Sequence, residues 1–160
     1  MTRFKFVVGK LAVLTCLAVV CYAQGTEGDT HLGTWMVTVT PPAASGRPAF
    51  NALITFAGGG AFIASTQNDH AIPSAGIQQG SWQRGADGQI SSTEVYFVYL
   101  PTGVAVGTVK VRATYAFSDP DTLTGSGQLL LCDLNVANCN LLPGFASLQG
   151  KRVEVEPVGP

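Results

Sequence analysis

Eight segments with the pattern of β-strands follow one another along this chain, and every second connection between them is long while the others are tight. The segments span residues 33–40, 50–57, 61–66, 77–84, 89–100, 104–117, 123–131 and 148–156. In an up-and-down antiparallel arrangement, successive connections fall at opposite ends of the sheet. The alternation in length therefore predicts one end closed by tight turns and a second end, the mouth, rimmed by irregular loops.

The residues between the strands support this division. Pro41 and Pro42 end the first strand, whereas three glycines at 58–60 turn the second strand directly into the third. The other tight turns are 85–88 and 118–121, and the mouth is expected to consist of residues 41–49, 67–76, 101–103 and 132–147. Because binding residues are often carried on loops by a rigid scaffold, function is expected at the mouth.

The N-terminus has the features of an export signal. Arg3 and Lys5 precede a largely apolar run over residues 6–20. The small residues Cys21 and Ala23 then occupy the two positions that a signal peptidase recognises before its cleavage site. We expect cleavage after Ala23 and a secreted or periplasmic protein. A membrane anchor is the alternative, but Lys10 leaves the apolar run shorter than the roughly 18 residues of a span.

Removal of the signal leaves residues 24–160, a length suited to a single domain with its own core. The signal carries three of the nine Lys and Arg residues and none of the ten acidic ones, so the mature chain has a net charge near −4. Its basic residues are scattered, and nucleic-acid binding would need them on one stripe with aromatic side chains between. The composition therefore excludes a nucleic-acid partner.

Two cysteines leave with the signal, and Cys132 and Cys139 are the pair that stays. In an oxidising compartment we expect them to form a disulfide, which would stabilise a loop of eight residues by roughly 2.5 kcal/mol. Zinc is the alternative, but a tetrahedral site needs a second pair of cysteines or nearby histidines. We expect no metal site and no cofactor.

Strand number and patterning predict an all-β fold, an eight-stranded antiparallel up-and-down barrel, with a two-layer sandwich as the alternative. The segment 104–117 gives the clearest inner face, formed by Val109, Val111, Ala113, Tyr115 and Phe117. The final segment similarly sets Val153 and Val155 against a charged face of Arg152, Glu154 and Glu156. Such charged outer faces do not suit an outer-membrane barrel, whose lipid-facing band is apolar.

The first expected strand carries Gly33-Thr34-Trp35, and Arg152 lies on the last. With these two features the chain resembles the calycin group, which includes lipocalins and streptavidin-type barrels. In lipocalins a Gly-x-Trp places its indole at the closed end of the barrel, where an arginine packs across the ring, and the resemblance gives Trp35 and Arg152 these structural roles. The chain departs from the group by lacking a C-terminal helix, and Trp82 belongs to a second Gly-x-Trp. The alternative is that both tryptophans are ordinary core residues.

Few residues suggest chemistry. Asp69 and His70 are adjacent on a mouth loop, where a carboxylate beside an imidazole is either a proton-transfer pair or simply solvated. Glu94 shares one face of its strand with Tyr96. An inward Glu94 in an apolar cavity would have a raised pKa and could act as acid or base. We expect it to face outward, with Phe97 and its alternate neighbours packed inside. No catalytic residue is assigned.

Three classes of function stay open. The first is binding of a small apolar or amphipathic molecule at the mouth. The second is a cofactor-free cyclase or isomerase resembling the allene oxide cyclase type of barrel, which requires Glu94 or His70 to face the cavity. The third is a surface or assembly module, including a homo-oligomer, suggested by apolar residues on outer strand faces. The candidate ligand-binding residues are Asp69, His70, Trp82, Tyr96, Val109, Val111, Tyr115 and Phe145.

Overall fold

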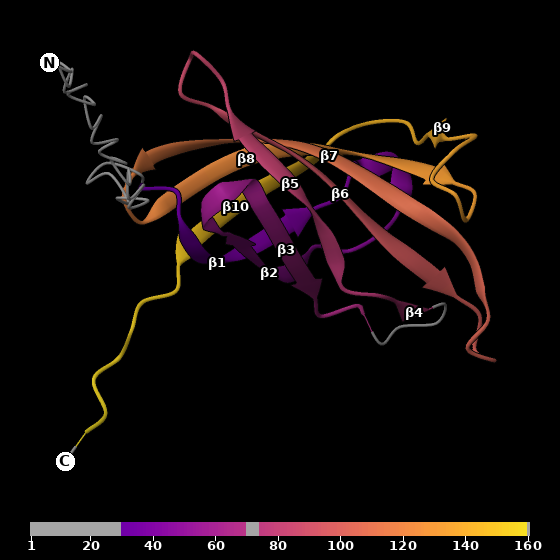
Figure 1. Ribbon diagram of the computed structural model, residues 1–160, viewed down its shortest axis with the longest axis horizontal. Coiled ribbons are helices and arrows are strands. Elements are labelled where there is room, and N and C mark those ends of the chain that lie inside the picture. Colours follow the sequence, from indigo (N-terminus) through magenta and orange to yellow (C-terminus); the bar gives the residue numbers. More distant parts are fainter. Residues whose placement is uncertain (1–29, 70–73, 160) are drawn as a thin grey trace, which may run out of the picture.

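The series of strands closes into an eight-stranded antiparallel β-barrel (Figure 1). This computed structural model describes residues 30–69 and 74–159, so the expected export signal and its cleavage site lie outside the described residues. The barrel strands are β1 (Gly33–Thr40), β2 (Phe50–Phe56), β3 (Ala61–Thr66), β5 (Gln78–Arg84), β6 (Ile90–Tyr99), β7 (Ala105–Asp119), β8 (Thr122–Cys132) and β10 (Ala146–Arg152). Each pairs with the next along the chain, and β10 pairs with both β8 and β1.

Two short strands lie within mouth connections that we expected to be irregular. β4 (Ser74–Ala75) pairs with the last residues of β6, and β9 (Asn140–Leu141) pairs with the end of β8. They extend a wall formed by the long strands β6, β7 and β8, which have 10, 15 and 11 residues against 6 to 8 in β1, β2, β3, β5 and β10. The barrel is therefore taller on one side than on the other, as Figure 1 shows.

The final strand differs from its predicted span. It begins at Ala146 and ends at Arg152, and the residues beyond it run away from the barrel (Figure 1). Val153 and Val155 are 47% and 97% exposed, so the prediction that they form an inner face is wrong. The reason is that β8 begins at Thr122, opposite Lys151, and leaves later residues without a strand to pair with on that side.

The closed end is filled by aromatic side chains. Phe56 packs edge-on against Phe62 and Tyr115 at centroid distances of 5.3 and 5.1 Å, and Trp35 packs against Phe117 at 5.1 Å. Trp35 is fully buried, and its Nε1 donates to the carbonyl oxygen of His31 at 3.0 Å. Such edge-to-face packing adds to the stabilisation that burial of the rings gives. This layer forms the core of the protein.

Arg152 covers the closed end from outside and links it to neighbouring backbone carbonyls. Its guanidinium carbon lies 4.4 Å from the centroid of the Trp35 ring, and its Nη1 donates to the carbonyl of Leu32 at 2.7 Å. Its Nε donates to the carbonyl of Pro120 at 2.8 Å. Gly33 makes room for this side chain, because a Cβ there would lie 2.8 Å from Nη1 and the backbone φ of +122° disfavours other residues. Although expected on the exposed face of its strand, Arg152 thus packs against the core.

Candidate functional site

An internal cavity of about 710 Å³ opens at the mouth of the barrel. It exists because the layer of side chains above the aromatic core is small. On three strands the next inward residue above a large core residue is an alanine, and on β8 the inward residues above Leu123 are two glycines. These small residues are Ala52, Ala64, Ala113, Gly125 and Gly127. The wall above them is mainly apolar, with Val109, Val111 and Leu129 on β7 and β8. The sequence thus builds a closed base and an open, apolar upper half.

Three of the four expected mouth loops line this cavity. The loop 41–49 contributes Pro42 and Arg47, and the β8–β10 connection contributes residues 142–144. These two loops touch at Gly144, where φ is +86° and a Cβ would lie 2.7 Å from the Pro42 Cβ. The loop 101–103 does not reach the cavity, because it tops the tall β6–β7 hairpin. None of the tight turns at the closed end takes part.

Glu94 faces the cavity, so the expectation that it points outward is wrong. It is 3% exposed, and its Oε2 accepts a hydrogen bond of 2.8 Å from Ser92 Oγ. Its neighbour on β5 is Gly80, where a Cβ would lie 2.6 Å from the Glu94 Cα, so the strands approach closely beside it. Burial raises the pKa of Glu94 to about 7, against a smaller lowering effect of the Ser92 bond. Near neutral pH this carboxyl can both take up and release a proton.

Two tyrosines accompany Glu94 in the cavity wall. Burial raises the pKa of Tyr115, and the Glu94 charge raises it further. Burial also raises the pKa of Tyr96, where a neighbouring positive charge of Arg47 opposes the effect and the charges of Asp69 and Glu94 add to it. Both hydroxyls therefore stay protonated at ordinary pH and can donate hydrogen bonds.

The other predicted ligand-binding residues separate into two groups. Val109 and Val111 line the cavity. Asp69 does not, because its carboxylate accepts hydrogen bonds from the backbone N and the Oγ1 of Thr66, at 2.8 and 2.6 Å. Its predicted partner His70 lies outside the described residues. Phe145 is 60% exposed and is not among the residues that line the cavity.

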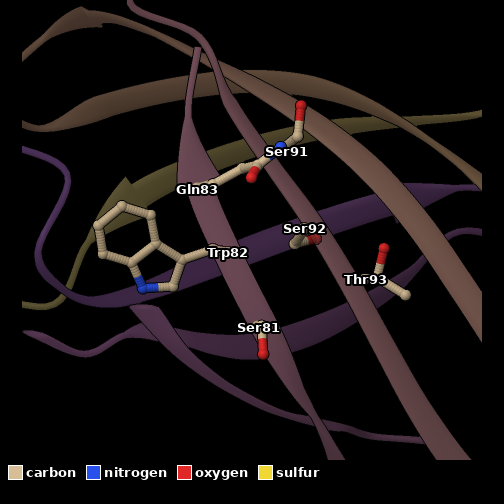
Figure 2. A pocket seen from close by; sticks show the side chains of 6 residues that line it. All are labelled: Ser81, Trp82, Gln83, Ser91, Ser92 and Thr93. Atoms are coloured by element: carbon tan, nitrogen blue, oxygen red, sulfur yellow. The ribbon is translucent and has the colours of Figure 1, made fainter. Parts of the chain in front are cut away.

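Trp82 lies at the closed end instead of the mouth. Its Nε1 donates to the carbonyl of Ala57 at 2.9 Å, and its ring packs edge-on against His31 at 4.5 Å. A second, open hollow of about 250 Å³ lies beside it, along β5 and β6. Figure 2 shows the indole directed away from the β6 side chains Ser91, Ser92 and Thr93, and this hollow has about a third of the volume of the large cavity. The large cavity is the stronger candidate.

Cys132 and Cys139 are joined by a disulfide, which lies on the outside of the wall. Because Leu129 and Leu131 of β8 line the cavity, the two-residue period directs Cys132 outward. The loop that it closes covers Thr108 on β7, whose Oγ1 donates to the carbonyl of Asp133 at 2.8 Å. The disulfide therefore lies on the outer side of the wall formed by β7 and β8, and it does not border the opening of the cavity.

Searches of protein-family models, curated proteins and solved structures found no match to this chain. Within residues 30–69 and 74–159, no helix has the length and apolar character needed to cross a bilayer. The same residues contain no cluster of three or more histidine, cysteine or acidic side chains suited to a metal ion.

Sequence reasoning missed Arg47 as a cavity residue. It stands alone in a connection of small residues, prolines and glycine, and isolated arginines of this kind are common on solvated loops. Its position matters because it is the one cationic side chain among the described residues that line the cavity. Arg47 and Glu94 thus place opposite charges at the rim and on the inner wall of an otherwise mainly apolar chamber.

Proposed function

We propose that this protein binds a small apolar or amphipathic molecule in the barrel cavity, which the molecule enters through the mouth. The observation that carries the proposal is the volume of about 710 Å³, within the range of small-molecule sites. At about 30 Å³ for each water-sized group, the cavity would hold a ligand of roughly 20 to 25 non-hydrogen atoms. A binding protein needs no nucleophile, which agrees with the absence of a catalytic motif in the sequence.

The alternative of a purely structural or assembly module is less well supported. Apolar residues do lie on the outer strand faces, and Met36, Leu53 and Ile63 are between 42% and 49% exposed. A module of that kind does not need an open cavity, and larger side chains that filled the cavity would stabilise the protein. We therefore favour the inside of the barrel as the functional surface.

Location and family belong to the same proposal. The N-terminal export pattern and the disulfide support a secreted or periplasmic protein, because disulfides persist in oxidising compartments. The contact of Arg152 with Trp35 at the closed end supports a calycin-like barrel, the group that the sequence resembles. Ligand binding in the open half would agree with that resemblance.

The test is a pair of glycine substitutions. Gly127→Leu adds a side chain inside the cavity, where a Cβ meets nothing closer than 3.5 Å, and Gly58→Leu adds the same group to an exposed turn with no atom within 4 Å. Native mass spectrometry of protein purified from its own host should show a bound small molecule in the wild type and in Gly58→Leu, and not in Gly127→Leu. Equal occupancy in a folded Gly127→Leu variant would refute binding in the cavity.

One observation favours a second candidate, a cofactor-free cyclase or isomerase. Glu94 faces the cavity with a pKa near 7, as proton transfer at neutral pH requires, and the hydroxyls of Tyr96 and Tyr115 could stabilise a developing oxyanion. Incubating the co-purified molecule with the wild type should then convert it to an isomer, whereas Glu94→Gln should bind it and leave it unchanged. Recovery of the unaltered molecule from the wild type would refute the enzyme.

A further inference from the structure

We propose that the ligand is an apolar amine, whose protonated nitrogen pairs with the carboxylate of Glu94 inside the cavity. The inference rests on the proposed function and goes further by naming the chemical class of the ligand. An acidic side chain is placed in a mainly apolar wall, where burial of a charge is costly unless an opposite charge compensates it.

No opposite charge in the described part of the protein compensates Glu94. Among the described residues that line the cavity, it is the one acidic side chain, and no Lys, Arg or His there forms an ion pair with it. Its Oε2 accepts from Ser92, and no described group donates to its Oε1. Arg47 is exposed on the mouth loop, and its charge affects Tyr96 but has no resolved effect on Glu94. A counter-charge would therefore come from the ligand.

A protonated amine fits this position better than other head groups. It brings a positive charge and three donors to a carboxylate whose Oε1 accepts no hydrogen bond from the described residues, and folding has already buried that carboxylate. The rings of Tyr96 and Tyr115 in the same wall offer further attraction to a cation. A carboxylate ligand would instead place two like charges together, and a neutral ligand would leave Glu94 uncompensated.

The remaining lining sets the shape of the amine. Its apolar part would extend from Glu94 toward the mouth along Val109, Val111 and Leu129. There it meets Arg47, which repels a second positive charge. The cavity should therefore accept a monoamine with a bulky or extended apolar body and discriminate against a diamine of the same length.

The pairing predicts a specific dependence on pH. The titratable groups around Glu94 are Tyr96 and Tyr115, which stay neutral, and Arg47 and Asp69, which act on Tyr96 from the rim. With a pKa of about 7, Glu94 is almost fully ionised at pH 8.5 and only a few per cent ionised at pH 5.5, while an alkyl amine is protonated at both. Affinity for an amine should therefore fall roughly 30-fold between these pH values.

The experiment compares three probes of equal length by isothermal titration calorimetry: n-decylamine, n-decanol and n-decanoate. In the wild type at pH 8.5, the amine should bind at least about tenfold more tightly than the alcohol, and most of this preference should vanish at pH 5.5. Glu94→Gln should keep the affinity for the alcohol and lose the preference for the amine at both pH values. Glu154→Gln changes an exposed carboxylate in the C-terminal segment and should behave as the wild type.

The outcomes separate the two proposals. If the alcohol binds as tightly as the amine at pH 8.5, or if Glu94→Gln keeps the preference, the amine inference is overturned. Loss of alcohol binding in Gly127→Leu would in that case leave the proposed cavity function standing. If none of the three probes binds to the wild type, the proposed function is overturned, and the amine inference with it.

Discussion

Replacing Glu94 by Gln should stabilise this protein at neutral and alkaline pH and leave its stability unchanged below about pH 4. The folded-state pKa of Glu94 is raised from 4.5 to about 7, so the folded state holds this proton more tightly than the unfolded chain does. The stabilisation from the protonated form is fully present below pH 4.5 and is lost as the pH rises through 7. A glutamine side chain in its place would be neutral at every pH, and its amide oxygen can accept the Ser92 hydrogen bond.

The size of the effect follows from the pKa. A difference between 4.5 and about 7 corresponds to roughly 3 kcal/mol at about 1.4 kcal/mol per pKa unit, and the 3% exposure of the residue makes solvent screening minor. Above about pH 8, Glu94→Gln should therefore unfold with a free energy roughly 3 kcal/mol higher than the wild type. For a domain of this size, that corresponds to a melting temperature roughly 10 °C higher.

Urea denaturation of both proteins between pH 3.5 and pH 9 measures this difference directly. The two curves of unfolding free energy against pH should converge below about pH 4, separate mainly between pH 4.5 and pH 7, and stay apart above pH 8. Glu154→Gln serves as the control, and its exposed position should keep it within about 0.5 kcal/mol of the wild type throughout. Parallel curves for the wild type and Glu94→Gln, or a variant that is less stable than the wild type at pH 9, would refute the argument that burial without a counter-charge raises the pKa of Glu94.

Three further predictions concern the closed end, the rim and the disulfide. Trp35→Ala should lower the free energy of unfolding by roughly 3 to 5 kcal/mol in urea, because the fully buried indole leaves a void, and a loss below about 1 kcal/mol would contradict its place in the core. Arg47→Ala should change ligand affinity in calorimetry while stability stays within about 0.5 kcal/mol, and a large loss of stability would show that the exposed rim is structural. In the unreduced protein Cys132 and Cys139 should not react with a thiol reagent, and the double substitution of these residues by Ser should lower the free energy of unfolding by roughly 2.5 kcal/mol; reactive thiols at both positions would rule out the disulfide.

The barrel itself could be predicted because two local signals agree. Tight turns rich in glycine and long connections alternate along the chain, and β7 carries a clean two-residue period over which Val109, Val111, Ala113 and Tyr115 face inward. A strand with such a pattern can bury its apolar side chains in only one of its two orientations relative to the core. The positions of the mouth and of the closed end follow from the same signals.

Glu94 shows where this reasoning stops. Both faces of β6 carry large side chains, with Tyr96 and Val98 on one and Phe97 and Tyr99 on the other, so hydrophobicity does not set which face is inside. The face is set by pairing with β7, where Glu94 lies opposite the inward residue Val111. The C-terminal end of β10 could not be predicted from the sequence for a related reason. Its alternation continues through Val153 and Val155, but the neighbouring strand that would cover them does not.

The double pairing of β10 has a consequence for how the chain reaches its native state. Before residues 146–152 are available, β1 and β8 each present a row of unpaired backbone groups, which is a template for aggregation. Arg152 then contacts the carbonyl oxygens of Leu32 and Thr30, 120 and 122 residues away, and contacts so distant in sequence form slowly. Folding can finish only when the last strand inserts, so a chain that stops before Ala146 should aggregate even though seven of its eight barrel strands are complete.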